Sequence, residues 1–310
     1  MIIAVTYDGS IIRTPVEEFI VQNSKTPGSF NKYYANGVRA IQQASIDDTL
    51  LLFTESGICF KVDVKDIPST TTFNHGVSHH DILSANAPFC SILPSRGLFN
   101  SSSTEDYFVV IMTKNYKIMR QNLADYRMLK NGSAVVTLDS DDKVVSVALV
   151  KESDVIFNCT NTGKGKLFDV GEVPTTSLKS KSRGRVCYNR NKGGLGIYMS
   201  CMDAGADYQA RWLAVSSNGF LIKSMGNELG MVPRNFSGVV TIMLYEADQL
   251  LFNSFIDNTE DILLVTKKGM VARLNISSIK EQHRGGVGKK CMTLEGDDKI
   301  VACCKVLPKI

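Results

Sequence analysis

The sequence predicts an all-β protein, built as one closed ring of six units with about four strands each. A hairpin-like pair of apolar runs recurs about every fifty residues. Glycine-led runs and acidic turns follow most of these hairpins, and helical periodicity is almost absent from the 310 residues. Closure into a ring also accounts for how so many strands avoid exposed edges.

Each unit begins with two apolar runs joined by a polar-glycine turn, the pattern of a tight hairpin. The expected hairpins span 2–19, 50–67, 108–126, 155–173, 212–229 and 262–279. Their turn residues are Gly9, Gly57, Gly163, Gly219 and Gly269, with Asn115-Tyr116 in the third unit.

A glycine opens the next expected strand of five units, at 37–41, 132–138, 196–202, 238–244 and 288–294. Acidic turns then precede a further strand, at Asp47-Asp48, Asp141-Asp142, Asp248 and Asp297-Asp298. The third strand of the second unit has no clear signal. Because no linker interrupts the repeat, we expect one domain over 1–310, with blades at 1–48, 49–102, 103–153, 154–208, 209–258 and 259–310.

Composition places the chain among soluble cytoplasmic proteins. The N-terminus lacks the basic lead of a signal peptide, and no apolar run approaches the roughly 18 residues that span a bilayer. The eight cysteines form no C-x-x-C pair and are expected as reduced core thiols. His75, His79 and His80 cluster beside Asp81, where a polar loop is favoured over a metal site because no second ligand cluster exists. No cofactor is expected.

Alternation along the second strand of each hairpin places one basic side chain on the outward face. This slot holds Arg13, Lys61, Arg120, Lys223 and Arg273, while the fourth unit has Leu167 there. Ordinary solvated faces would carry mixed signs, so we expect a basic belt around the ring.

Two further stretches concentrate positive charge. "KSKSRGRVCYNRNK" contains no acidic residue, and its basic residues are Lys179, Lys181, Arg183, Arg185, Arg190 and Lys192. "EQHRGGVGKK", residues 281–290, combines glycines with fixed charges. An exposed hairpin turn is the plain interpretation of this second stretch. A loop whose backbone approaches an anion closely is the alternative.

The repeats "LLFTESGICFKVDVKDIP" and "ILLVTKKGMVARLNISSIKEQHRGGVG" resemble blades of the C-terminal DNA-wrapping domain of bacterial type IIA topoisomerase subunits, the gyrase A and topoisomerase IV C type. The resemblance extends over essentially the whole chain and implies a six-bladed β-pinwheel, in which neighbouring blades exchange a strand and DNA bends around a basic rim.

The loop in the last unit resembles the family's gyrase box, Q-R-R-G-G-K-G, at five of seven positions. The resemblance implies DNA-binding roles for Gln282, His283, Arg284, Gly285, Gly286, Gly288, Lys289 and Lys290. His283 and Val287 depart from the basic residues of the box. The family's box also belongs to the first blade, where this chain keeps Gln22 without the RGG core. Ring closure places the last blade next to the first. We therefore expect this loop on the rim beside the first blade.

The resemblance implies sequence-independent binding and wrapping of double-stranded DNA, association with the nucleoid, and no catalysis by this chain alone. It also implies a cleavage domain upstream in the same subunit, together with an ATPase subunit in the holoenzyme. In later units a polar segment precedes the first strand, as in "STEDYFVV" and "NTEDILLV", whereas the chain begins at the strand itself. This difference favours a longer native subunit over a standalone protein. The alternative function is a propeller that binds a protein partner without binding DNA.

Overall fold

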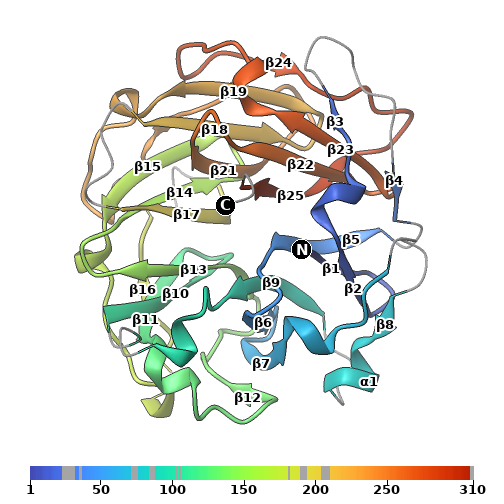
Figure 1. Ribbon diagram of the computed structural model, residues 1–310. Helices are drawn as coiled ribbons and strands as arrows, with labels where there is room; N and C mark the ends of the chain where they lie inside the picture. Colours follow the sequence, from blue (N-terminus) through green and yellow to red (C-terminus); the bar gives the residue numbers. More distant parts are fainter. Residues whose placement is uncertain are drawn as a thin grey trace.

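The computed structural model describes residues 1–22, 32–34, 37–70, 76–83, 88–101, 104, 106–180, 182–188, 194–203 and 210–307. Their strands form six sheets, or blades, set around a central axis (Figure 1). Five blades have four strands and the sixth has five. The predicted all-β ring of six blades is therefore confirmed.

The inner strand of each blade faces the axis, where a cavity of about 210 Å³ is lined by residues from all six. These strands are β5 (Val38–Gln43), β9 (Phe89–Pro94), β13 (Val144–Lys151), β17 (Gly196–Met202), β21 (Leu250–Ile256) and β25 (Ile300–Val306).

The middle two strands of each blade are the expected hairpin. The pairs are β1 (Ile2–Thr6) with β2 (Ser10–Thr14), β6 (Thr49–Thr54) with β7 (Ile58–Asp63), β10 (Tyr107–Thr113) with β11 (Lys117–Asn122), β14 (Val155–Thr160) with β15 (Lys164–Asp169), β18 (Arg211–Ser216) with β19 (Phe220–Met225), and β22 (Asp261–Thr266) with β23 (Met270–Asn275).

The hairpin turns require a left-handed residue. Gly269 has φ +88°, and a Cβ there would lie 1.9 Å from the Tyr34 carbonyl oxygen. In the third unit Tyr116 takes the left-handed conformation at φ +61°, and its buried ring stacks on Tyr188 at 4.8 Å. Ring packing holds this residue in a conformation that glycine adopts more readily.

The outer strand of each blade is donated by the next unit along the chain. These strands are β8 (Val77–Ser78) on blade 1, β12 (Ser133–Ala134) on blade 2, β16 (Arg185–Val186) on blade 3, β20 (Val239–Val240) on blade 4 and β24 (Lys289–Lys290) on blade 5. Blade 6 is completed by β3 (Val21–Gln22) and β4 (Lys32–Tyr33) of the first unit, which closes the ring.

The glycine-led runs, expected as the third strand of their units, take two different positions. The runs at 37–41 and 196–202 enter the inner strands β5 and β17 of their own blades. The runs at 132–138, 238–244 and 288–294 supply outer strands of only two residues. An apolar run after a glycine looks the same in either position, so the sequence pattern did not separate the two.

The hydrophobic core consists of clusters that each join two neighbouring blades. In the cluster between blades 6 and 1, Ile2 and Ala4 pack with Leu263 and Val265. The first and last blades are thus joined by packing as well as by strand exchange.

Helical structure among the described residues is limited to short segments. They are α1 (His79–Leu83) and the 3₁₀ turns η1 (Val16–Glu18), η2 (Val64–Asp66), η3 (Leu98–Asn100), η5 (Leu123–Tyr126), η6 (Val170–Glu172), η7 (Leu178–Ser180), η8 (Gly226–Glu228) and η9 (Ile276–Ser278). Most of the 3₁₀ turns follow a hairpin and redirect the chain toward the neighbouring blade.

Candidate nucleic-acid interface

The basic slot on the second hairpin strand does not form an exposed belt. After a 3₁₀ turn that follows a hairpin, the chain runs back beside the slot of the preceding blade, and its backbone bonds to Arg13, Arg120 and Lys223. Thr70 donates its N–H to the Arg13 carbonyl at 2.9 Å, and Gln282 does the same to Lys223 at 2.8 Å. Alternation gives the face of the sheet on which a side chain lies, but not whether another segment covers that face.

The expectation that this slot faces solvent is wrong for Arg120 and Lys223, which are 7% and 4% exposed. Arg120 pairs with Glu152 at 2.8 Å and bonds the Thr175 hydroxyl. The Lys223 ammonium donates to the Ile276 carbonyl at 3.2 Å, and burial lowers its pKa.

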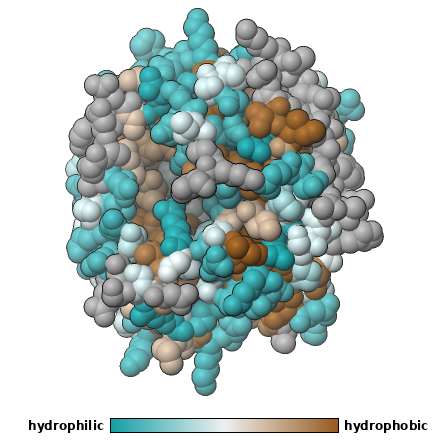
Figure 2. All heavy atoms as spheres, viewed as in Figure 1, coloured by the Kyte–Doolittle hydropathy of each residue, from teal (hydrophilic) through white to brown (hydrophobic). Residues whose placement is uncertain are grey.

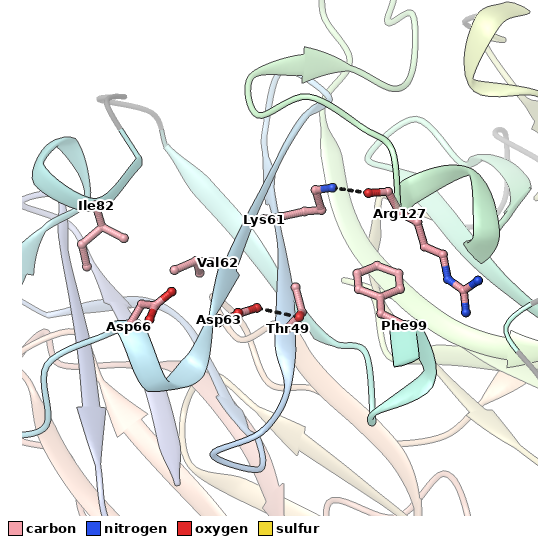
Figure 3. Close-up of a pocket in the computed structure, with 8 residues that line it drawn as sticks. All are labelled: Thr49, Lys61, Val62, Asp63, Asp66, Ile82, Phe99 and Arg127. Atoms are coloured by element: carbon pink, nitrogen blue, oxygen red, sulfur yellow. Dashed lines mark hydrogen bonds between the residues drawn. The ribbon is translucent and has the colours of Figure 1, made fainter. Parts of the chain in front are cut away.

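Two half-buried members of the slot bind the neighbouring blade. Arg273 pairs with Asp261 at 2.7 Å and donates to the carbonyls of Val16 and Phe19, at either end of η1 in blade 1. Lys61 donates to the Arg127 carbonyl of blade 3 at 2.6 Å (Figure 3). These side chains connect blades. Arg13 is half-buried as well.

A groove of about 560 Å³ lies beside Lys61, between blades 2 and 3 (Figure 3). The described residues that line it are Thr49, Lys61, Val62, Asp63, Asp66, Ile82, Phe99 and Arg127. Asp63 accepts from the Thr49 hydroxyl at 2.7 Å, while Arg127 bonds Ser101 and Thr104. Its charges have mixed signs and largely bind other protein groups, so the groove does not form a polyanion site.

The loop containing Arg284 is exposed on the rim, between blades 5 and 4. Its end, β24, pairs with β19 of blade 5, and Gly285 N–H donates to the Thr241 carbonyl beside blade 4 at 2.7 Å. The expectation that it lies beside the first blade is wrong. Outer strands are donated to the preceding blade, so the sixth unit reaches blade 5. The first-unit loop in the corresponding position, 23–31, lies outside the described residues.

The glycines of this loop serve contact with protein backbone. Gly288 has φ +78°, and a Cβ there would lie 2.7 Å from the Leu221 carbonyl oxygen. Gly285 has φ +75° but more room, with the nearest atom at 3.9 Å. Gly286 has an ordinary φ, and a Cβ there would meet its nearest atom at 3.4 Å. Close packing on blade 5 therefore requires glycine most clearly at 288.

Arg284 and His283 are exposed and share one carboxylate. Arg284 N–H donates to Glu228 at 2.8 Å, and the His283 ring lies 3.1 Å from the same group. Burial alone would raise the pKa of Glu228, but these two contacts together with the Ser224 hydroxyl outweigh it and hold that pKa below its usual value. Lys289 and Lys290 are exposed, and Gln282 is half-buried.

Arg234, which the sequence analysis did not select, repeats the geometry of Arg284 one blade earlier. Its N–H donates to Glu172 at 2.8 Å, and its guanidinium donates to the Val186 carbonyl of β16. The Arg284 guanidinium donates in the same way to Val240 of β20. The sequence signal that could have identified Arg234 is an arginine followed four residues later by glycine, which occurs in both "PRNFSG" and "HRGGVG".

The other basic stretch lies on blade 3. Lys179, Arg183 and Arg185 are exposed, with Arg185 in β16 and Arg183 within 3.7 Å of Asp139. Lys181, Arg190 and Lys192 lie outside the described residues.

These elements form a continuous surface across blades 3, 4 and 5, which we call the rim track. It consists of β16, the loop 233–238, β20, the loop 283–288 and β24. The two arginine contacts above join each loop to the outer strand of the preceding blade. Its basic residues are Arg185, Arg284, Lys289 and Lys290, which are exposed, and Arg234, which is half-buried. Exposed Arg183 lies just before β16.

Lys166 binds the backbone of the rim track from the protein interior. It is fully buried, and its ammonium donates to the carbonyls of Cys187, Arg234 and Phe236, the last at 2.9 Å. Burial lowers its pKa to about 8. One side chain therefore holds the end of β16 against the loop 233–238.

Other site types receive little support among the described residues. No group of three His, Cys, Asp or Glu there could hold a metal ion, and His75 lies outside the described part. No described helix is long and apolar enough to cross a membrane. On the face shown in Figure 2, hydrophobic atoms form separate patches within a mostly hydrophilic surface.

Comparison with known proteins gives three consistent findings. The family described as "DNA gyrase C-terminal domain, beta-propeller" matches residues 1–28, 48–77, 107–151, 154–186 and 260–303. The chain is 24% identical over 328 aligned positions to the DNA gyrase A protein of Metamycoplasma arthritidis, covering 99% of this chain and 34% of that protein. It is 22% identical to the DNA gyrase A protein of Staphylococcus aureus, covering 97% and 34%.

Solved structures agree with the fold. A DNA gyrase A C-terminal domain has a TM-score of 0.83 at 18% identity, covering 99% of both chains. A DNA topoisomerase IV C-terminal domain has a TM-score of 0.73 at 19% identity, covering 99% of this chain and 93% of the other. The chain spans about a third of the length of the curated relatives it matches.

Proposed function

The chain belongs to the DNA gyrase C-terminal domain family, and from this premise we propose that it binds duplex DNA along the rim track and bends it. The observation that best supports the proposal is the row of arginines and lysines across three successive blades, all of them exposed except half-buried Arg234. Arg185, Lys289 and Lys290 lie on outer strands at the periphery of the ring. Arg234 and Arg284 are bonded to outer strands, and Arg183 lies just before one.

Such a surface recognises phosphates and not bases. Guanidinium and ammonium groups neutralise backbone charge and release counterions, so affinity falls as salt rises. Six contacts correspond to a slope of log K against log salt of about −5. Phosphate contacts carry no sequence information, so unrelated duplexes bind alike.

Curvature of the ring makes bending part of binding. A duplex that follows the outer strands of three blades must curve with them. Bending a site of 20–30 base pairs through 40–90° costs about 1–6 kcal/mol by elastic estimates. The phosphate contacts along the rim track offset this cost, and a straight duplex would reach fewer of them.

The chain spans only part of its relatives, so the activity of a whole subunit is a further proposal. We infer that this chain holds DNA for a type IIA topoisomerase, as part of a gyrase A or topoisomerase IV C type subunit. In such an enzyme a cleavage domain upstream and an ATPase subunit would supply the chemistry.

A protein-interaction scaffold is the second candidate. The observation that favours it is a group of exposed apolar residues on blades 4 and 5: Phe236, Val240, Met243 and Tyr245. Binding to an apolar protein surface would depend only weakly on salt, in contrast to DNA binding.

Fluorescence anisotropy with two unrelated labelled duplexes, from about 50 to 200 mM salt, tests the proposal. We expect equal affinities and a steep linear loss of affinity with salt. Absence of binding at the lowest salt would overturn it.

A further inference from the structure

The middle of the rim track carries an exposed aromatic side chain. Phe236 is 59% exposed and belongs to none of the six core clusters. The strands on either side, β16 and β24, carry Arg185 and Lys289-Lys290. An apolar ring therefore lies between two basic segments of the rim track.

The loop does not need this side chain in order to fold. Phe236 and Gly286 occupy the same place in the two equivalent loops, each two residues after the arginine and two before the final glycine. The two loops make the same contacts to the preceding blade, although one has a phenyl ring at this place and the other has a hydrogen atom.

The backbone on both sides of Phe236 is held tightly. Its N–H donates to the Pro233 carbonyl at 2.9 Å, and its carbonyl accepts from buried Lys166 at 2.9 Å. The next carbonyl, of Ser237, accepts from the Tyr188 hydroxyl. A Cβ on Gly238 would lie 2.5 Å from the Gly165 carbonyl oxygen, so the loop is pressed against blade 4. The ring projects from a rigid base.

Arg234, two residues before Phe236, adds positive charge at the same place. Its guanidinium bonds Val186 of β16, beside Arg185. A polyanion attracted by these groups would meet the phenyl ring. Among the parts of duplex DNA, the base faces and sugar edges of the minor groove offer apolar surface to such a ring.

We propose that Phe236 inserts into the minor groove of bound duplex DNA and partly unstacks one base step, which kinks the duplex midway along the rim track. Apolar wedges of this kind bend DNA toward the major groove. Flexible pyrimidine–purine steps are the most easily opened. This inference rests on the proposed DNA binding and adds a defined point of bending to it.

The test uses Phe236→Gly, which copies the equivalent loop, and Phe236→Leu, which keeps an apolar wedge. Met243→Gln is the matched control, because Met243 is 57% exposed nearby but lies outside the loop 233–238. Bending is measured by energy transfer between labelled DNA ends at matched occupancy. Unstacking is measured with 2-aminopurine placed at successive steps of the duplex.

We expect the parent, Phe236→Leu and Met243→Gln to bend DNA alike and to raise 2-aminopurine emission at one step. Phe236→Gly should lose that emission and bend less, while its affinity falls by no more than about threefold and its salt slope is unchanged. If Phe236→Gly fails to fold, as circular dichroism would report, Phe236→Ser takes its place in the same comparison with Phe236→Leu.

Failure of the two proposals is distinguishable. If the parent does not bind duplex DNA, the proposed function fails together with this inference. If the parent binds with a steep salt slope but the variant that lacks the ring bends and unstacks DNA equally, only the wedge is overturned. A third outcome is that apolar peptides bind in a salt-insensitive way that requires Phe236, while removal of Phe236 leaves DNA bending unchanged. This outcome would assign the ring to a protein partner and overturn the wedge.

Discussion

The Arg284 guanidinium lies 3.3 Å from the Val240 carbonyl oxygen and so joins the loop of one blade to the outer strand of the preceding blade. Arg234 makes the same contact to Val186 one blade earlier. Repetition of this contact produces a continuous edge from blade 3 to blade 5. Strand exchange determines where the charge on that edge lies, because it brings each donated loop beside the outer strand of the preceding blade.

Charge reversal on the rim track should weaken DNA binding uniformly. In the variant R185E/K289E/K290E we expect lower affinity for unrelated duplexes by similar factors. The salt slope should become shallower by about 1 for each phosphate that the variant no longer neutralises. Anisotropy titrations at several salt concentrations measure both quantities. Lys65→Glu is the control, since Lys65 is exposed on η2 of blade 2, away from the rim track. Equal losses in this control would contradict a localised site.

Arg273→Met should reduce stability without reducing DNA affinity. Arg273 and Asp261 form a largely buried ion pair, and removal of one partner from a buried pair costs about 3 kcal/mol or more. Urea unfolding measures the loss, and the double variant with Asp261→Asn should recover part of it. A large loss of DNA affinity in a folded Arg273→Met protein would restore the basic-belt hypothesis.

Gly288→Ala should destabilise the protein by about 1–3 kcal/mol, because its φ is left-handed and a Cβ would clash with the Leu221 carbonyl. Gly285→Ala keeps the strained φ but has space, so we expect a smaller loss, about 1 kcal/mol. Gly171→Ala is the control, since its backbone is ordinary and no atom lies within 4 Å of its Cβ. The urea midpoint should be lowest for Gly288→Ala, higher for Gly285→Ala and highest for Gly171→Ala. Equal midpoints would contradict this prediction.

Alkaline pH should destabilise the fold through its buried thiols. Burial raises the pKa of Cys291 from 9.0 to about 12. The folded thiol therefore keeps its proton where the unfolded thiol loses it. Stability is fully present below pH 9 and falls as pH rises toward 12, by about 1.4 kcal/mol per thiol at pH 10.

Urea unfolding between pH 8 and pH 10 measures this slope. Cys291→Ala should show a shallower fall than the parent, because one titrating group is removed. Identical slopes in the two proteins would show that this thiol is not protected by burial.

The sequence predicted the hairpins and the ring because those features have local causes. A left-handed turn favours glycine, as at Gly269, and buried strands of six residues produce strong apolar runs. Outer strands of two residues, such as Lys289–Lys290, produce no periodic signal, so their exchange between blades was implied only by resemblance to a family.

Some residues of the candidate site were selected from the sequence, and others were not. Exposed Arg185, Arg284 and Lys290 were selected from local charge, which the sequence displays directly. The burial of Lys223 depends on the segment that crosses it, and alternation within one strand contains no information on that segment. Arg234 was missed because its loop lacks paired glycines, although its contacts match those of Arg284.

Site-directed photocrosslinking tests the central claim, that the rim track holds duplex DNA, most directly. Because burial raises the pKa of all eight native thiols, a cysteine introduced at an exposed position should be labelled selectively. Lys290→Cys and Lys65→Cys, each carrying the same photoreactive group, are irradiated with two unrelated duplexes. We predict crosslinks to both duplexes from position 290 and few or none from position 65. Equal crosslinking from both positions, or crosslinking from position 65 alone, would contradict the claim.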